Sequence, residues 1–251
     1  MEIVVLLKQV PDTESMISVA DDGVSIKTDD IKWVISPYDE FAVEEALRIR
    51  DAGGGKVTIL TVGGDKAVEA IRTALAMGAD EGILINDPAA AGCDGLGTAR
   101  ILAAALKEMP YDVIIAGQRA VDDDNFLVGT AVAEYLGIPN ISLVNKQEIA
   151  DGKIKCQRTI EGGVVVLEAV LPALFTTQRG LNEPRYASLH NIMNAMKQQL
   201  YVSPPADLGV AVSSQLTHVT VEPHEVRHAG FTVEDVDQLV DYLKNEGKVI
   251  G

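Results

Sequence analysis

The chain has 251 residues, 47% of them hydrophobic, and a formal net charge of −16. Its length fits one large domain, or one domain with an extension, and its apolar fraction is enough for a sizeable core. The acidic balance argues against binding to nucleic acid or to an anionic membrane surface, and no apolar run approaches the roughly 20 residues of a membrane-spanning helix.

The first half of the chain alternates between strand-like and helix-like segments. The N-terminal MEIVVLLKQV has no basic leader and enters a strand pattern at once, so we expect a cytoplasmic protein. Buried strands are predicted at residues 2–8, 56–62, 82–86 and 111–117. A capping box from Ser36 to Asp39, with Pro37 in the first helical position, opens one intervening helix, and Gly78 ends another. This alternation predicts an α/β fold, a parallel sheet with helices on both faces.

The pattern changes after Pro139. Turn signals at Asp151-Gly152 and Gly162-Gly163 lie within strand-like sequence and predict an antiparallel meander over residues 141–177. A helix is predicted next, over residues 189–198.

The last part of the chain has the composition of an arm. It holds one alternating strand at 218–222 and a final helix that opens at Thr232, where Asp235 completes a second capping box. The arm is too short to bury much area alone, so we expect it to pack on the body of this chain or on another subunit. The chain is therefore divided into an α/β domain at 1–203 and an arm at 204–251.

The strand ends are the expected ligand site, because parallel α/β sheets bind ligands beyond the carboxyl ends of their strands. Glycines and polar residues follow the predicted strands, which suits a nucleotide, although structural turns would give the same pattern. In AGQRAVDDDNFLVG, the aspartates from Asp122 to Asp124 precede a predicted helix that begins near Asp124. They either cap that helix, or leave its first amides free for a phosphate while Arg119 offsets part of their charge.

The inventory of catalytic groups is poor. We find no nucleophile with a plausible base and no metal-ligand cluster, and Cys93 and Cys156 have no paired spacing. Neighbouring carboxylates such as Glu44 and Glu45 are expected to be solvated on a helix face. We therefore predict a protein that is not an enzyme and that binds a ligand or shapes part of a shared site.

Six segments, in order along the whole chain, resemble the beta subunits of electron transfer flavoproteins. They are VVLLKQVPDT, SPYDEFAVEEALRIRD, IRTALAMGAD, AGQRAVDDDNFLVG, IKCQRTIEGGVVVLEAVLPALFTT and LPALFTTQRGLNEPRYASLHNIMNAMK. The resemblance implies a Rossmann-like, adenine-nucleotide-binding fold whose C-terminal arm wraps an alpha subunit that carries a redox-active FAD. It also implies electron transfer from acyl-CoA dehydrogenases to a membrane quinone oxidoreductase. Such a beta subunit buries AMP or, in electron-bifurcating members, a second FAD.

The resemblance also implies two sets of site residues. The nucleotide contacts would be Leu6, Ser36, Pro37, Tyr38, Asp39, Gly63, Gly117, Gln118, Arg119, Ala120, Val121, Asp122, Asp123, Asp124, Asn125, Phe126, Leu127 and Val128. The partner-docking residues would be Arg185, Tyr186, Leu189, Ile192 and Met193. Leu189 would anchor in a hydrophobic pocket of the dehydrogenase; the alternative is a core leucine on a short helix.

The chain departs from the family pattern in three places. AMP-binding relatives often have Asn and Thr where this chain has Phe126 and Val128, and bifurcating members usually have Asp-Gly-Asp-Thr at residues 122–125. AMP and FAD therefore both stay open, and the 181–200 region favours the non-bifurcating type with AMP. Some relatives have a lysine-rich run at 194–198, so partner choice is open too. A non-redox nucleotide-binding protein of similar fold is the remaining alternative.

Overall fold

The computed structural model describes residues 1–86, 90, 92–204, 209–210, 214–223, 230 and 232–250. The strands are β1 (Glu2–Leu6), β2 (Gln9–Pro11), β3 (Trp33–Ile35), β4 (Lys56–Val62), β5 (Glu81–Ile85), β6 (Val113–Gly117), β7 (Asn140–Ala150), β8 (Lys153–Ile160), β9 (Gly163–Val170), β10 (Ala173–Thr177) and β11 (Tyr201–Ser203). The helices are α1 (Pro37–Gly53), α2 (Ala67–Met77), α3 (Gly95–Lys107), α4 (Val128–Leu136), α5 (Leu189–Lys197) and α6 (Val236–Asn245). Among these described helices, none is both long and apolar enough to cross a membrane.

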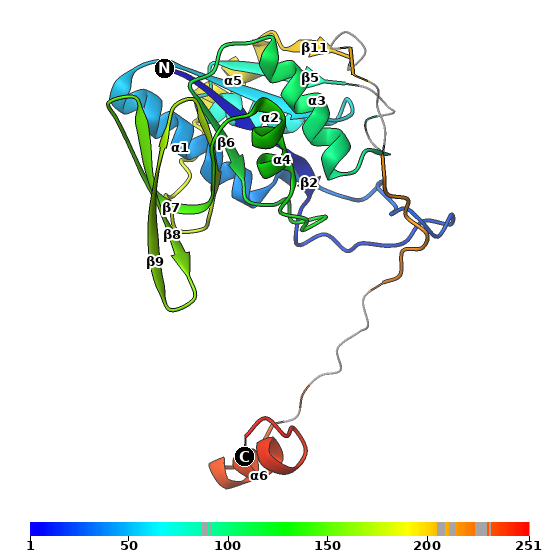
Figure 1. Ribbon diagram of the computed structural model, residues 1–251. Coiled ribbons are helices and arrows are strands. Elements are labelled where there is room, and N and C mark those ends of the chain that lie inside the picture. Colours follow the sequence, from blue (N-terminus) through cyan, green and yellow to red (C-terminus); the bar gives the residue numbers. More distant parts are fainter. Residues whose placement is uncertain are drawn as a thin grey trace.

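The structure confirms the predicted α/β fold (Figure 1). Nine strands form one sheet in the order β11-β5-β4-β1-β6-β10-β7-β8-β9, and β2 and β3 form a small antiparallel pair. Every pairing from β11 to β7 is parallel. The four strands predicted in the first half all form, with ends that agree to within about two residues, which is the usual uncertainty of element boundaries.

Helices cover both faces of the sheet, and each face has its own core. Ile3 and Val5 of β1 pack with buried residues of α1, α2 and α5. Val4 and Leu6 of the same strand pack with α3 and α4 on the other face. Successive side chains of a strand point to opposite faces, so a continuous apolar run such as EIVVL is what a central strand with two covered faces requires.

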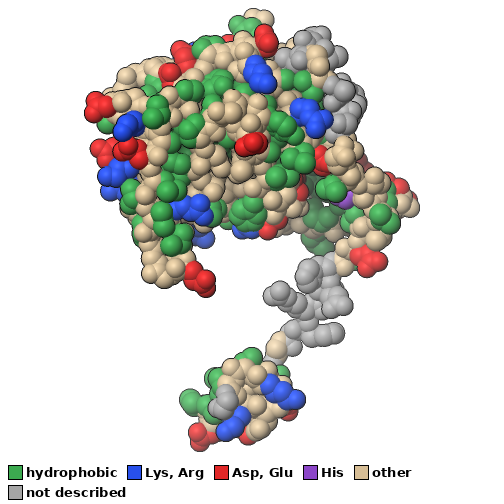
Figure 2. Space-filling model, viewed as in Figure 1, with side chains coloured by type: hydrophobic (Ala, Val, Ile, Leu, Met, Phe, Trp, Pro, Cys, Tyr) green, Lys and Arg blue, Asp and Glu red, His purple; other side chains and the backbone are tan. Residues whose placement is uncertain are grey.

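The antiparallel meander is confirmed for β7, β8 and β9. Its turns lie at the predicted places, with positive φ at Asp151, Gly152 and Gly162. The predicted meander extended to residue 177, and that part is wrong, because β10 is a parallel strand between β6 and β7. All five residues of β10 are buried, whereas β8 and β9 lie largely on the surface, where Figure 2 shows hydrophobic side chains on the hairpin.

The final helix begins later than predicted. Asp235, rather than Thr232, is its N-cap residue, and the Asp235 side chain accepts a hydrogen bond from the Gln238 amide at 2.8 Å. Within α6 no residue is buried, and Figure 2 shows apolar and charged side chains together on its surface. Some of the predicted arm lies outside the described residues, namely 205–208, 211–213, 224–229, 231 and 251.

The strand predicted at residues 218–222 does not form in this described segment. The Val221 amide instead donates to the carbonyl oxygen of Gly23 at 2.8 Å, in the long loop between β2 and β3. The arm therefore runs beside that loop before it leaves the α/β domain (Figure 1).

Candidate functional site

A cavity of about 790 Å³ lies at the carboxyl ends of the central strands. The strand order changes direction at β1, with β4 and β5 on one side and β6 on the other. Open α/β sheets bind ligands in the crevice at such a switch point. Leu6 to Gln9 at the end of β1 and Ala116 to Ala120 at the end of β6 both line the cavity.

Asp39 joins the two strand ends across the switch point. Its carboxylate accepts the Lys8 amide at 2.8 Å and the Gly117 amide at 2.9 Å. The predicted capping box is wrong, since the Ser36 side chain makes no capping hydrogen bond among the described residues and Asp39 bonds to the strands instead. Burial raises the pKa of Asp39 to about 7, against the two amide hydrogen bonds and the charge of Lys8, which lower it.

Gly117 permits the close approach of α1 to β6. A Cβ atom at this position would lie 2.3 Å from Asp39 Oδ1 and 2.9 Å from Tyr38 Cβ. It would also lie 3.0 Å from the Asp39 amide nitrogen, which belongs to the helix backbone and cannot rotate away. The glycine is therefore needed for packing at the site.

The three aspartates do not cap α4. The helix begins at Val128 rather than near Asp124, and its N-cap, Leu127, has no side-chain capping bond within the described chain. Lys8 Nζ lies 2.9 Å from Asp122 and 3.1 Å from Asp123. Burial alone would lower the pKa of Lys8, but these two carboxylates outweigh burial and raise it. Their charge is thus partly neutralised before any ligand binds.

Arg119 contacts Asp124 and the aromatic rings of Tyr38 and Phe126. Its guanidinium donates to Asp124 at 2.7 Å and to the Tyr38 hydroxyl at 3.0 Å. The same group lies 5.1 Å from the centroid of the Tyr38 ring and 5.0 Å from that of Phe126, within range of cation–π attraction. The expectation that Arg119 offsets part of the acidic charge is confirmed for Asp124.

Three helices begin at the wall of the cavity. Ala67 of α2, Gly95 of α3 and Val128 of α4 all line it, and each stands at or near the start of its helix. The first amides of a helix lack intrahelical partners and favour negative charge. The Ala67 amide of α2 already donates to the Gly64 carbonyl oxygen and the Gly97 amide of α3 to the Asp94 side chain, so the N-terminus of α4 is the best suited of the three to an anion. Two further polar atoms, Trp33 Nε1 and Gln118 Oε1, belong to lining residues and are buried without a hydrogen-bond partner among the described residues.

The structure brings most of the predicted nucleotide contacts to this cavity. Those that line it are Leu6, Asp39, Gly63, Gly117, Gln118, Arg119, Ala120, Asp122, Asp123, Asn125, Leu127 and Val128. Those outside its lining are Ser36, Pro37, Tyr38, Val121, Asp124 and Phe126. Tyr38, Asp124 and Phe126 still act on the site, because each contacts Arg119.

Several lining residues were missed by sequence reasoning. They include Trp33, Lys66, Cys93, Gly95, Thr98, Gly129 and His218. Lys8, Gln9, Gly64 and Asp65 also line the cavity, but they are among the glycines and polar residues at strand ends where the sequence predicted a ligand. Trp33 and His218 carried no such signal, because a long loop and the arm bring them to the site.

Part of the arm, residues 214–223, crosses the cavity, and we call it the crossing segment. His218 lines the cavity. The Gln215 amide donates to the Asp94 side chain at 2.6 Å, at the N-terminus of α3. Beyond His218, the segment bonds to the β2–β3 loop through Val221. It therefore joins the N-terminus of α3 to the β2–β3 loop.

The predicted docking residues lie on α5 and the chain before it. Tyr186 is fully exposed, and Leu189 is 74% exposed, which excludes the alternative of a core leucine. Ile192 and Met193 are also exposed. We call these four residues the docking face. Arg185 differs from them, because its side chain is bonded to α1.

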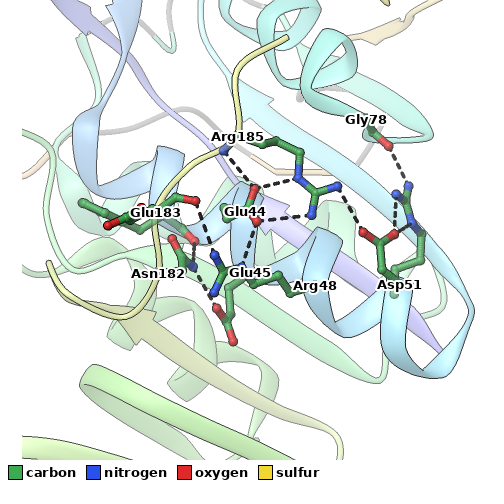
Figure 3. Close-up of polar contacts among 10 residues, drawn as sticks. Glu44, Glu45, Arg48, Asp51, Gly78, Asn182, Glu183 and Arg185 are labelled. Carbon is green, nitrogen blue, oxygen red and sulfur yellow. Dashed lines mark hydrogen bonds and ion pairs between the residues drawn. The ribbon is translucent and has the colours of Figure 1, made fainter. Parts of the chain in front are cut away.

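The two glutamates expected to be solvated are buried instead. Glu44 is 3% exposed and Glu45 is 6% exposed. They face the chain segment that leads into α5, and both accept hydrogen bonds from it (Figure 3). This burial could not be predicted from local sequence, because the groups that cover the two glutamates lie about 140 residues further along the chain.

The open sheet and the cavity at its switch point place this chain in the class of α/β proteins that bind a ligand at the carboxyl ends of their strands. The electron transfer flavoprotein domain model matches residues 24–208. The electron transfer flavoprotein subunit beta of Bradyrhizobium diazoefficiens is 38% identical over 251 residues, which are 100% of each chain. The Homo sapiens subunit beta is 38% identical over 252 residues, with 99% of each chain covered. The mitochondrial subunit beta of Oryza sativa subsp. indica is 38% identical over 254 residues, with 100% of each covered.

The chain belongs to the beta subunits of the electron transfer flavoproteins. Membership implies a part in flavin-dependent electron transfer and an alpha subunit as partner. It also favours an electron carrier over a catalytic enzyme, and it argues against the alternative of a non-redox nucleotide-binding protein.

Proposed function

We propose that this chain is the beta subunit of a heterodimer that carries electrons from acyl-CoA dehydrogenase-type flavoenzymes to a membrane quinone oxidoreductase. The redox-active FAD belongs mainly to the alpha subunit, and this chain does no bond chemistry of its own. Family membership over the full length is the observation that carries the proposal. A cytoplasmic location stays a prediction, and the relative from Oryza sativa has a mitochondrial name.

The cavity at the switch point is proposed to hold AMP. Its volume of about 790 Å³ is within the usual range for small-molecule sites. The amides of Val128 and Gly129 at the start of α4 are suited to a phosphate, and Asp122 and Asp123 to ribose hydroxyl groups. The unpartnered Trp33 Nε1 and Gln118 Oε1 also fit a polar ligand. AMP would act structurally, by filling the cavity.

FAD remains the alternative ligand, as in electron-bifurcating members of the family. Val128 favours it, because AMP-binding relatives often have Thr there, whose hydroxyl could donate to a phosphate. In this chain the backbone amides of α4 would supply that contact instead. The 181–200 region favours the non-bifurcating type, and so we propose AMP.

Docking to the dehydrogenase is proposed to use the docking face, with Leu189 as its anchor. One apolar side chain that enters a desolvated pocket, surrounded by polar contacts, suits a transient complex. The exposure of Leu189, 74%, supports this role, because an unbound anchor must be accessible. The arm is proposed to pack on the alpha subunit, since the apolar residues of α6 have no cover within the described chain.

The test is reduction of the purified heterodimer by an acyl-CoA dehydrogenase. Leu189→Ala should lower kcat/KM by about tenfold or more, the usual effect of truncating an interface anchor, and leave the FAD content unchanged. Tyr201→Ala is the matched control, since Tyr201 is exposed and lies on β11 outside the docking face. Equal rates for the wild type and Leu189→Ala at low heterodimer concentration would refute the docking role.

A further inference from the structure

Glu44 of α1 holds the chain segment that leads into the docking face (Figure 3). Its carboxylate accepts Arg185 Nε at 2.8 Å and Nη2 at 3.2 Å, and also the Arg185 amide at 3.1 Å. A second guanidinium, that of Arg48, donates to the same carboxylate at 2.9 Å. Burial raises the pKa of Glu44, but the hydrogen bonds from the two arginines outweigh it and the pKa is lowered. Glu44 therefore stays ionised at neutral pH.

Glu45, the next residue of α1, holds the same segment at a second point. It accepts Asn182 Nδ2 at 2.8 Å, and Gln147 Nε2 of β7 at 2.7 Å. Asn182 also donates to the carbonyl oxygen of Phe41 at 3.0 Å. Residues 182 to 185 are thus fixed to one helix by side-chain and backbone groups, although the segment itself has no regular secondary structure.

The far end of the docking face is fixed as well. Ala195 of α5 is 2% exposed and packs in the core with α2. The Arg72 guanidinium of α2 donates to the Ala195 carbonyl oxygen. Gln198 Nε2 donates to the carbonyl oxygen of Asp80 at 2.6 Å. The exposed docking face therefore lies between two fixed points.

This arrangement combines an exposed apolar surface with a constrained backbone. The side chains of the docking face are exposed, so their own packing contributes little to fixing their positions. A buried ion pair adds little net stability, because desolvation of the charges offsets their attraction. Its planar, two-point geometry does fix orientation, since the arginine fork matches a carboxylate.

We propose that Glu44 and Arg185 are positioning residues that preorganise the docking face for the donor enzyme. The proposal rests on the docking role proposed above. If the segment were released, it would sample many conformations, and the apparent affinity would fall in proportion to the fraction that is competent to bind. Electron transfer within the docked complex would be unaffected, because neither residue belongs to the docking face.

The first test is steady-state reduction of the heterodimer by an acyl-CoA dehydrogenase, with the heterodimer as the varied substrate. In Glu44→Gln and Arg185→Ala, we expect KM to rise about tenfold, as it would if about one tenth of the population kept the competent conformation. The value of kcat should stay within about twofold of the wild type. Arg185→Lys should fall between Arg185→Ala and the wild type, since lysine keeps the charge but loses the fork.

Lys153→Ala is the matched control. It removes an exposed ion pair, Lys153 with Glu168, on the β8–β9 hairpin. Exposed pairs contribute little, so neither KM nor kcat should change. A rise in KM for this control equal to that of Glu44→Gln would overturn the proposal, because any lost ion pair would then have the same effect.

The second test needs no donor enzyme. Amide hydrogen exchange over residues 185–193 of the free heterodimer should become about tenfold faster in Glu44→Gln, because the tethered conformation is populated less. If Glu44→Gln fails to fold, Arg185→Lys replaces it as the test variant, because Arg185 is partly exposed. Hydrogen exchange in Arg185→Lys should be faster than in the wild type, by a smaller factor than that expected for Glu44→Gln. Unchanged exchange in both variants, or faster exchange with an unchanged KM, would overturn the proposal.

Reduction rates and hydrogen exchange together distinguish failure of the docking role from failure of the positioning role. If Leu189→Ala leaves reduction unchanged while exchange in Glu44→Gln still accelerates, the tether exists but the docking role is wrong. If Leu189→Ala slows reduction while Glu44→Gln changes neither KM nor exchange, the docking role holds and the positioning role is wrong.

Discussion

At the scale of single residues, a buried carboxylate organises the site. Asp39 bonds to the strand ends of β1 and β6 at once, at the point where the sheet changes direction. Gly117 makes room for it. Both were named as site residues from the family resemblance, but the capping role that local sequence suggested for Asp39 is wrong. A sequence pattern gives local partners only, whereas Lys8 and Gly117 are 31 and 78 residues away from Asp39.

Substitution of Asp39 by asparagine tests its titration. Burial raises its pKa from 3.8 to about 7 in the folded state, so the folded protein binds the extra proton between those values. The stabilisation from that proton is present below about pH 4 and is lost as the pH rises toward about 7, with a slope of up to about 1.4 kcal/mol per pH unit. Asp39→Asn should remove this slope.

The measurement is the free energy of unfolding of both proteins by denaturant at a series of pH values from about 5 to about 8. The wild-type value minus that of Asp39→Asn should decrease as the pH rises, and then level off above the folded pKa. A difference that is the same at every pH would contradict the assigned titration.

Gly117→Ala tests the close approach of α1 to β6. The new methyl group would meet Asp39 and Tyr38, so we expect a loss of roughly 1–3 kcal/mol of stability, as for other overpacked sites. Gly53→Ala is the control, because a Cβ there meets no described atom within 4 Å. Thermal melts of the two variants report the difference, and equal melting temperatures would show that the packing around Gly117 yields without cost.

At the scale of elements, the helices and strands with a clear local pattern of apolar or turn residues could be predicted, and those fixed by distant contacts could not. Continuous apolar runs identified the central strands, and the turn residues identified the β7–β9 meander. The run ALFTT of β10 carried the same signal of a strand covered on both faces, but its neighbourhood suggested a meander. The start of α4 and the crossing segment could not be predicted, since long-range pairs with Lys8 and Asp94 fix them.

The crossing segment provides a prediction at this scale. Because His218 lines the cavity and Gln215 is bonded to Asp94, a bound nucleotide should restrain residues 214–223. Addition of AMP to nucleotide-free protein should slow hydrogen exchange there, and leave the distant β8–β9 turn at Gly162 unchanged. Protection confined to the strand ends, with none in the crossing segment, would contradict the expected contact between this segment and the nucleotide.

At the scale of the whole molecule, the described chain has a cavity proposed for a nucleotide, an exposed face proposed for docking, and a final helix whose apolar residues are uncovered. The three lie on different parts of the chain, and α1 joins two of them. Asp39 in its first turn lies at the cavity, and Glu44 in its second turn bonds to the chain segment that leads into the docking face. A single helix thus fixes both surfaces in relation to each other.

The arm is proposed to join this chain to its alpha subunit, and Leu239→Asp tests that role. Leu239 is 41% exposed on α6, beside Val236 and Val240. A charge on that face should reduce copurification of the alpha subunit strongly, because an apolar interface would have to bury it unpaired. Asp237→Asn on the same helix is the control and should copurify normally, whereas equal recovery of the alpha subunit with Leu239→Asp would contradict the proposed contact.

The identity of the bound nucleotides tests the central claim most directly. Denaturation of the purified heterodimer, followed by chromatography of the released nucleotides, should give one FAD and one AMP for each heterodimer. That result is expected because the cavity at the switch point is proposed to take an adenylate, and the redox-active FAD is proposed to belong mainly to the alpha subunit. Two FAD molecules per heterodimer, or FAD with no adenylate at all, would contradict the account.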